Sequence, residues 1–499
     1  MADVIIAGGG PVGMLLACEL RLRDIDVVVL EKLPQPSPHS RAFRLQPRTM
    51  ELLDYRGLAE RFRQGRKEWP KAHFAGLQPL LELGELDSEH PYSLLIPQAE
   101  TERLLAARAA ELGAVVRRGH AVVALDQHDE GVRVEVAGDD GPYTLRARFL
   151  VGCDGGRSTV RRLAGFAFPG SEAQVTALLG DVALPDPVQL PMGLPGTART
   201  PRGLLMAVAL QPSVTRVLTT EFISPRAESD APVTVDELRA AIDRVIGRPV
   251  DIGEAHWLSR FSDATRLVEE YRRGRVLLAG DAAHIHFPIG AQGLSLGLQE
   301  AMNLGWKLAA EVRGEAPAGL LDSYHLERHP VARRVLRETR VQLALMNPDE
   351  STDPLREVFG ELLAIPAVNR HLAALVSGTD VRYAADGDDH ALVGCPAPVL
   401  DLKTDDGRTT RIPELLASGR GVLLVLAESA AGQHRTPVPL PDGVDLVVAT
   451  TSRDPGVDAL LLRPDGHVAW AGSVDDLALP RALAAWFATD LEAGLKRDT

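Results

Sequence analysis

Short apolar runs alternate with segments of helical spacing along most of the chain, and the first such group begins close to the N-terminus. Residues 4–7 (VIIA) form an unbroken apolar run, which is typical of a buried parallel strand. Apolar residues within 15–22 recur at intervals of three and four, which predicts a helix with one buried face. A second apolar run at 27–30 completes a predicted strand–helix–strand unit.

Two later apolar runs end alike, at a glycine next to an aspartate. The first covers residues 146–154 (RARFLVGCD) and is followed by Gly155. The second covers 274–281 (GRVLLAGD), with Gly280 before Asp281. A turn at 288–293 follows the second run, and apolar and small residues then recur at intervals of three and four over 294–308. This spacing predicts a long helix with one packed face, ended by Gly314. Its charged residues are expected to project away from that face: Glu300, Lys307 and Glu311.

The region between the two aspartate runs has a different pattern. Residues 203–210 and 216–222 are rich in apolar and β-branched residues and predict strands of an antiparallel sheet. The segment 237–247 (ELRAAIDRVIG) has the spacing of an amphipathic helix ended by glycine. The aromatic stretch from Trp257 to Phe261 is expected to pack where the chain re-enters the first domain.

The character of the chain changes again after about residue 385. Asp-Asp-Gly at 405–407 and Pro-Asp-Gly at 464–466 predict the tips of two hairpins. A short helix and a strongly apolar strand lie between them, and a final helix follows the second hairpin. No internal repeat or low-complexity tract is found in the sequence.

Composition and charge exclude several classes of function for this chain. The 499 residues carry a net charge of −14 with a sequence pI near 5.5, so the chain lacks the basic footprint of a nucleic-acid binder. No apolar run is long enough to span a bilayer, and a first strand that starts at Asp3 leaves no room for a signal peptide. Three scattered cysteines without a C-x-x-C argue against a metal or dithiol site, and Cys395 is expected to be a buried small hydrophobe. We therefore expect a cytoplasmic protein with no membrane or nucleic-acid partner and no metal.

The first turn carries a dinucleotide-binding pattern. Gly8 permits the tight turn, Gly10 lets the backbone approach a pyrophosphate, and Gly13 lets helix and strand pack closely. Glu31, at the end of the second strand, is placed to hydrogen-bond an adenosine ribose. The pattern itself leaves open whether the dinucleotide is FAD or NAD(P).

Three ordered motifs then carry a family resemblance: GxGxxG, CDGGRSTVR, and GDAAH followed by QEAMNLGWKLA. With these motifs and SYHLERHPVARRV, the chain resembles the FAD-dependent aromatic hydroxylases of the p-hydroxybenzoate hydroxylase type, the group A flavoprotein monooxygenases. It looks most like the branch that acts on polycyclic polyketides in antibiotic biosynthesis, which includes angucycline, anthracycline and rifampicin monooxygenases. The resemblance implies an α/β fold with three domains. They are a Rossmann-like FAD-binding domain (1–170 and 273–385), an α+β substrate-binding domain (171–272) and a thioredoxin-like C-terminal domain (386–499).

The resemblance also implies site residues. Asp281 would accept hydrogen bonds from ribityl or pyrophosphate-side hydroxyls, and the 288–293 loop would lie along the flavin ring, where a helix N-terminus stabilises the anionic reduced flavin. Arg44 would stack on a mobile flavin or meet the nicotinamide cofactor, and Asp154 would have a mixed FAD and NADPH role. The implied FAD-binding residues are Gly8, Gly10, Gly13, Glu31, Arg41, Gln98, Asp154, Asp281, Gly290, Gln292 and Gly293, with Arg103 a weaker candidate. The implied catalytic residues are Arg44, Pro288 and Gly290.

In this family, transiently bound NADPH reduces the flavin, which then reacts with O2 to form a C4a-hydroperoxyflavin that hydroxylates an aromatic substrate. Such a mechanism needs few acid or base side chains, because the cofactor carries the chemistry. We therefore expect His284 and His286 to hydrogen-bond loop backbone and not to act as bases. The chain departs from the family pattern at Ser295, where asparagine is common, and at Glu300, where aspartate is common.

Other functions stay open at this point. A flavin halogenase or reductase on the same fold is disfavoured, because the chain lacks a W-x-W-x-I-P motif and paired active-site cysteines. A catalytically silent flavin-binding protein is a third hypothesis, and the intact 288–293 motif argues against it. The sequence leaves the substrate, the choice between NADH and NADPH, and the oligomeric state undetermined, with a homodimer as one option.

Overall fold

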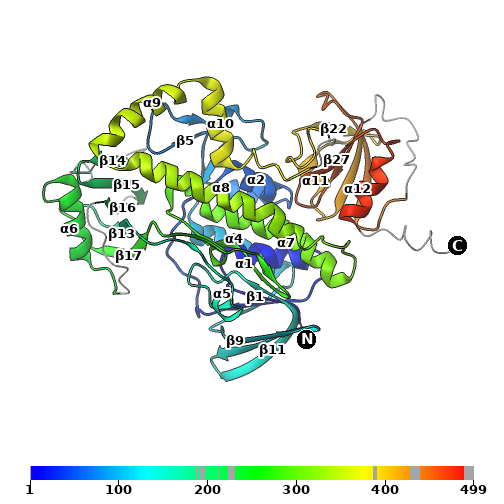
Figure 1. Ribbon diagram of the computed structural model, residues 1–499, viewed down its shortest axis with the longest axis horizontal. Coiled ribbons are helices and arrows are strands. Elements are labelled where there is room, and N and C mark those ends of the chain that lie inside the picture. Colours follow the sequence, from blue (N-terminus) through cyan, green and yellow to red (C-terminus); the bar gives the residue numbers. More distant parts are fainter. Residues whose placement is uncertain are drawn as a thin grey trace.

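A parallel sheet forms the centre of the protein and contains all four apolar runs described above (Figure 1). The computed structural model describes residues 2–186, 189–190, 197–211, 213–222, 231–385, 390–426 and 439–487. Strand β1 (Ala2–Ala7) lies between β2 (Val27–Glu31) and β11 (Gly141–Gly152), and β11 pairs with β20 (Val276–Leu278), each in parallel. The strand–helix–strand prediction is therefore confirmed.

Two further strands extend this sheet at its edges, and a hairpin continues from β11. The edge strands are β8 (Val115–Arg118) and β19 (Arg272–Arg273). Antiparallel β9 (Ala121–His128) and β10 (Gly131–Gly138) pair with the first part of β11. Helices of this unit include α2 (Pro47–Asp54), α3 (Ala59–Arg63), α4 (Gln98–Glu111) and α5 (Thr159–Leu163). Short strands between them are β3 (Arg44–Leu45), β4 (Lys67–Trp69), β5 (Lys71–Ala72), β6 (Leu81–Glu82) and β7 (Ser93–Leu95).

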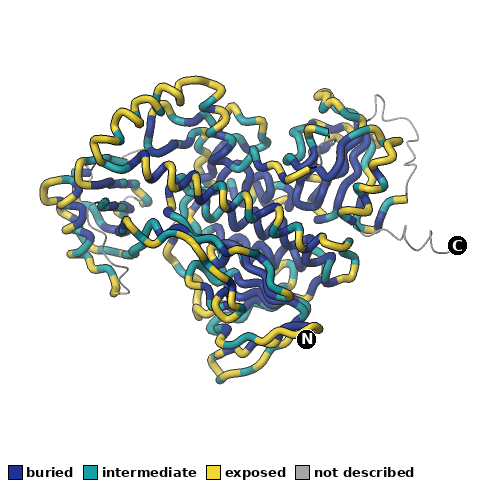
Figure 2. The backbone as a smooth tube through the Cα atoms, viewed as in Figure 1, coloured by how far each residue is buried: buried dark blue, intermediate teal, exposed yellow. Residues whose placement is uncertain are grey.

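The long helix α7 (Gly293–Arg313) ends before Gly314, as predicted, but it is buried on almost every side (Figure 2). It packs closely on α1 (Pro11–Arg21), because a Cβ on Gly305 would lie only 2.4 Å from the Cβ of Glu19. The expectation that its charged residues project outward was wrong for Glu300 and Lys307, which are both fully buried. Helix α8 (Ser323–Met346) and the C-terminal unit cover the sides of α7 that α1 leaves free.

Helices α9 (Asp353–Leu363) and α10 (Pro366–Ser377) follow α8 and complete the central unit. In the described part of the chain, no helix is both long and apolar enough to span a membrane.

A second, antiparallel sheet lies at one end of the central unit (Figure 1, green). Its order is β14 (Thr197–Thr200), β15 (Gly203–Gln211), β16 (Val214–Glu221), β13 (Thr176–Val182) and β17 (Ala255–Ser262). Helix α6 (Val235–Ile246) covers one face and ends at Gly247, so the predicted strands and helix are confirmed. Trp257 to Phe261 form part of β17, and Phe261 packs on Phe287 of the first domain, as expected.

The C-terminal unit contains a mixed sheet with the strand order β23-β22-β25-β24-β26-β27. Both predicted hairpins are confirmed, since β22 (Asp401–Thr404) pairs with β23 (Thr409–Arg411), and β26 (Ala459–Leu462) pairs with β27 (Val468–Gly472). The remaining elements are α11 (Ile412–Leu415), β24 (Gly421–Leu426), β25 (Val444–Thr451) and α12 (Ala478–Trp486). Cys395 is half-buried, less than expected, because it lies in a surface turn. The predicted boundary at 386 and the chain end at 499 lie outside the described residues.

Candidate active site

Three loops that are far apart in sequence meet at the carboxyl ends of adjacent strands. Gly8 follows β1, Asp154 follows β11, and Gly280 follows β20. The backbone N–H of Cys153 donates to the carbonyl of Ala7 at 2.7 Å, and the N–H of Ala279 donates to Gly152 at 3.0 Å. A crevice outside the carboxyl ends of parallel strands is where open α/β sheets bind nucleotides. The structure therefore brings the three sequence motifs together.

The glycines of the first turn have different surroundings. A Cβ added to Gly13 would lie 2.0 Å from the carbonyl oxygen of Gly8, so this position is closed by packing. A Cβ added to Gly10 would meet no atom within 4 Å, and no side chain caps the start of α1 beside it. Open space next to uncapped N–H groups at a helix N-terminus fits a pyrophosphate.

Two predicted carboxylates have clear structural partners. Glu31 accepts hydrogen bonds from the N–H groups of Gly9 at 2.7 Å and Leu33 at 2.8 Å, so it fixes the glycine turn. Asp154 accepts from the N–H groups of Thr159 at 2.6 Å and Val160 at 3.1 Å, so it caps α5. The contacts with ribose and with FAD or NADPH that were expected for these two side chains stay predictions.

Arg161 ties the second loop to the third, a role that no sequence pattern predicted. It lies on α5 and donates to the carbonyl of Gly156 at 2.8 Å and to the carbonyl of Ala282 at 2.9 Å. Asp281, between Gly280 and Ala282, is left exposed at this edge of the sheet.

A buried carboxylate on α7 holds the third loop. Glu300 accepts hydrogen bonds from the N–H of Gly280 at 2.7 Å and the hydroxyl of Tyr271 at 3.1 Å, and it lies 2.9 Å from Nε2 of His284. Burial alone would lower the pKa of His284, but Glu300 outweighs burial and the pKa is raised. His284 therefore bonds a carboxylate and not loop backbone, contrary to expectation. His286 does contact backbone, with Nδ1 at 2.8 Å from the carbonyl of Phe287, as predicted.

The 288–293 loop is held by side chains that sequence reasoning missed. Gly290 has φ +73°, a conformation that favours glycine, and its carbonyl accepts a hydrogen bond from Nε2 of Gln46 at 2.9 Å. The backbone N–H of Gln46 donates to the hydroxyl of Ser295 at 3.2 Å, which gives this serine a role in place of the family's asparagine. The buried amide nitrogens of Gln292 and Gln342 have no partner among the described residues and lie close to Gly290. Buried, unsatisfied donors beside a loop are consistent with a ligand there.

Residues 41–46 lead up to Gln46, whose side chain contacts this loop. Gln98 is tied to them, since its N–H donates to the carbonyl of Ala42 at 2.9 Å and its Oε1 accepts from the N–H of Ala42 at 3.3 Å. The side chain of Arg41 is exposed. Burial and the cation of Arg44 lower the pKa of His73 to about 4, so a neutral imidazole lies beside a guanidinium.

The antiparallel sheet presents its other face, opposite α6, to these loops. Cross-strand partners place Phe261, Ala177, Thr220 and Leu204 on this face, together with Trp257, Asp181 and Arg216. Phe261 lies 5.6 Å from Phe287, the ring of Trp257 stacks on His39 at 5.3 Å, and Arg216 lies 4.3 Å from the ring of Phe43. Half-buried aromatic and apolar side chains therefore border the 288–293 loop and residues 39–46.

Glu338 on α8 carries a carboxylate that is only 6% exposed, and burial raises its pKa from 4.5 to about 7. Because the folded pKa is raised, this group's contribution to stability is full below pH 4.5 and is lost as the pH rises through 7. Glutamine cannot ionise, so Glu338→Gln does not lose this contribution. Its free energy of unfolding relative to the wild type should therefore rise by about 2 kcal/mol between pH 5 and pH 8. Urea denaturation at both pH values measures this, and an equal difference at the two would contradict it.

Comparison with known proteins agrees with this geometry. The family profile described as "FAD binding domain" matches residues 1–339, and the profile described as "Aromatic-ring hydroxylase, C-terminal" matches residues 390–489. The chain is 45% identical to a 12-dehydrotetracycline 5-monooxygenase/anhydrotetracycline 6-monooxygenase of Streptomyces rimosus, over 97% of this chain and 98% of that protein.

Two solved structures have the same fold over the whole chain. An anhydrotetracycline hydroxylase from Streptomyces rimosus matches with a TM-score of 0.90 and 44% identity, covering 98% of this chain and 99% of that one. A Diels-Alderase from the biosynthetic pathway of pyrroindomycins matches with a TM-score of 0.85 and 40% identity, covering 98% of this chain and 100% of that one. The protein thus has the α/β FAD-binding hydroxylase fold with a C-terminal ring-hydroxylase domain.

Proposed function

The chain belongs to the FAD-binding aromatic-ring hydroxylases, and on that premise we propose that it is a flavin monooxygenase that uses NADPH and O2 to hydroxylate a polycyclic aromatic substrate of polyketide type. The convergence of the Gly8, Asp154 and Gly280 loops at one edge of the sheet carries this proposal. The relatives named after tetracycline intermediates support the substrate class.

The residues divide between the two ends of the cofactor. Gly10, the α1 N-terminus and Glu31 hold the adenosine and pyrophosphate end, while Asp281 and the 288–293 loop hold the ribityl chain and the ring. Arg41, Gln98 and Asp154 complete the FAD contacts in this proposal. When bound, FAD would accept a hydride from NADPH and would activate O2.

The protein's own contribution is positioning and electrostatics. The uncapped N-terminus of α7, at Gly293, faces the 288–293 loop and stabilises negative charge there. Arg44, two residues before the Gln46 that binds Gly290, adds a cation to this segment. The neutral His73 beside it accepts from the N–H of Gly76 at 3.4 Å through Nδ1, which leaves Nε2 protonated as a donor. The aromatic side chains of Phe261 and Trp257 on the sheet face exclude water above this site.

We assign the domains as follows: 1–170 with 273–385 bind FAD, 171–272 contact the substrate, and 386–499 form a thioredoxin-like domain. The mixed sheet of the last unit, in which β24 and β25 are parallel and their neighbours are antiparallel, supports the thioredoxin-like assignment. The absence of a C-x-x-C in the sequence argues for a structural role for this domain.

The proposal is tested by NADPH consumption in the presence of a panel of polycyclic phenols. A true substrate should raise the rate by about 10-fold or more, because substrate binding completes the site. Mass spectrometry should then show one added oxygen atom in the product. Slow NADPH oxidation that no aromatic compound stimulates would leave a flavin-binding protein without hydroxylase activity, and conversion of a ligand without NADPH would point to chemistry such as the Diels-Alderase relative's name indicates.

A further inference from the structure

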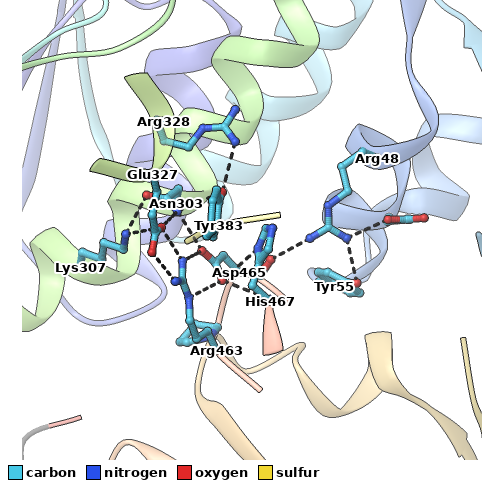
Figure 3. A network of polar contacts seen from close by, with 12 residues as sticks. Arg48, Tyr55, Asn303, Lys307, Glu327, Arg328, Tyr383, Arg463, Asp465 and His467 are labelled. Atoms are coloured by element: carbon cyan, nitrogen blue, oxygen red, sulfur yellow. Dashed lines mark hydrogen bonds and ion pairs between the residues drawn. The ribbon is translucent and has the colours of Figure 1, made fainter. Parts of the chain in front are cut away.

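The tip of the second C-terminal hairpin carries charged residues that are buried in the central unit. This hairpin tip, residues 463–467, connects β26 to β27. Arg463, Asp465 and His467 are only 2%, 1% and 5% exposed. Turn residues normally lie in solvent, so a buried, charged turn indicates a specific partner surface. Figure 3 shows these side chains pointing toward the central unit's helices.

One set of contacts joins the hairpin tip to α7 and α8. The carboxylate of Asp465 accepts a hydrogen bond from Nδ2 of Asn303 at 3.2 Å, and Arg463 donates to Glu327 on α8 at 2.9 Å (Figure 3). Lys307, one turn after Asn303 on α7, donates to Asn303 at 3.0 Å and to Glu327 at 2.7 Å. Burial alone would raise the pKa of Glu327, but Arg463 and Lys307 lower it to about 2, so Glu327 stays ionised.

A second contact joins the hairpin tip to the segment that holds the 288–293 loop. Arg48 donates through Nη2 to the backbone carbonyl of Asp465 at 3.3 Å, and through Nη1 to Glu51 at 2.8 Å. Arg48 lies two residues after Gln46, whose side chain binds the carbonyl of Gly290.

Both sets of contacts therefore connect the hairpin tip to elements that adjoin the 288–293 loop. Gln46, two residues before Arg48, holds the loop at Gly290, and α7 begins where the loop ends, at Gly293. A buried ion network adds little net stability compared with apolar residues of the same size, whereas its directional bonds fix one arrangement. We therefore expect the network to fix the position of the hairpin tip against α7 and α8 more than it raises the free energy of unfolding.

We propose that Asp465 of the C-terminal domain is a positioning residue for the 288–293 loop, acting through Asn303 on α7 and through Arg48. The inference rests on the proposed function, in which this loop lies along the flavin ring. It gives the C-terminal domain a role in the flavin site that acts through α7 and Arg48.

Asp465→Asn tests the proposal in the full-length holoenzyme. We expect the FAD Kd to rise by about 10-fold, a typical size for coupling between distant sites. We also expect a larger share of NADPH to be oxidised to hydrogen peroxide, and a changed flavin fluorescence spectrum. Arg48→Lys keeps a cation beside Glu51 but removes the second donor nitrogen, which reaches the backbone carbonyl of Asp465, so it should change the same readouts in the same direction. If Asp465→Asn does not fold, Arg48→Lys decides the question.

Leu479→Ala is the matched control, because Leu479 is fully buried within the C-terminal domain's own core. It should lower the Tm and leave FAD Kd, peroxide formation and flavin fluorescence unchanged at temperatures where the protein is folded. The proposal is overturned if Asp465→Asn and Arg48→Lys show the same flavin properties as Leu479→Ala. A wild-type protein that binds no FAD would contradict the proposed function instead.

Discussion

Gly10→Ala is expected to fold as stably as the wild type and to lose at least about 100-fold in FAD affinity, which corresponds to about 2.7 kcal/mol. The backbone at Gly10 is extended, with φ −75°, and a new Cβ would meet no protein atom within 4 Å. The added methyl group would instead occupy the space assigned to the pyrophosphate.

Gly13→Ala should behave differently, which makes it the matched comparison. A Cβ there would lie 2.0 Å from a backbone oxygen, so the turn and α1 must move apart, at a cost of about 1–3 kcal/mol in folding as well as loss of FAD. Thermal unfolding of the apoproteins and fluorescence titration with FAD measure the two effects separately. Wild-type FAD affinity in Gly10→Ala would show that the pyrophosphate does not lie at this turn.

Glu300→Leu should lower the free energy of unfolding by about 3–5 kcal/mol and abolish FAD retention. The substitution leaves three buried groups without their acceptor: the N–H of Gly280, the hydroxyl of Tyr271 and the imidazole of His284. The Gly280 loop would then lose its link to α7. Urea denaturation and the flavin content of the purified protein are the measurements.

Glu311→Gln is the control for this second prediction, since Glu311 lies on the same helix at a half-exposed position. It should change the free energy of unfolding by less than about 0.5 kcal/mol. Equal effects of the two substitutions would mean that Glu300 does not hold the loop.

The sequence predicted the parts of the fold that depend on local pattern. Unbroken apolar runs located β1 and β2, and helical spacing located α1 and α7, because these signals lie within short stretches of chain. That the three motifs serve one site was implied by the family resemblance and not by local pattern.

The predictions failed where tertiary packing decides. Glu300 and Lys307 lie off the apolar stripe of α7; Glu300 is buried against Tyr271, Gly280 and His284, and Lys307 is buried against Glu327 of α8. Gln46 was missed because a glutamine before proline at a helix start has no local signature of loop binding.

The central claim is that separate pieces of the chain hold opposite ends of one FAD, and ligand titration of three proteins tests it most directly. The wild type should bind one FAD per chain and should also bind ADP. Glu31→Gln should weaken FAD and ADP binding by the same factor, whereas Asp281→Ala should weaken FAD binding and leave ADP binding unchanged. A wild type that takes up no FAD, or an Asp281→Ala variant that binds FAD as tightly as the wild type, would contradict the account.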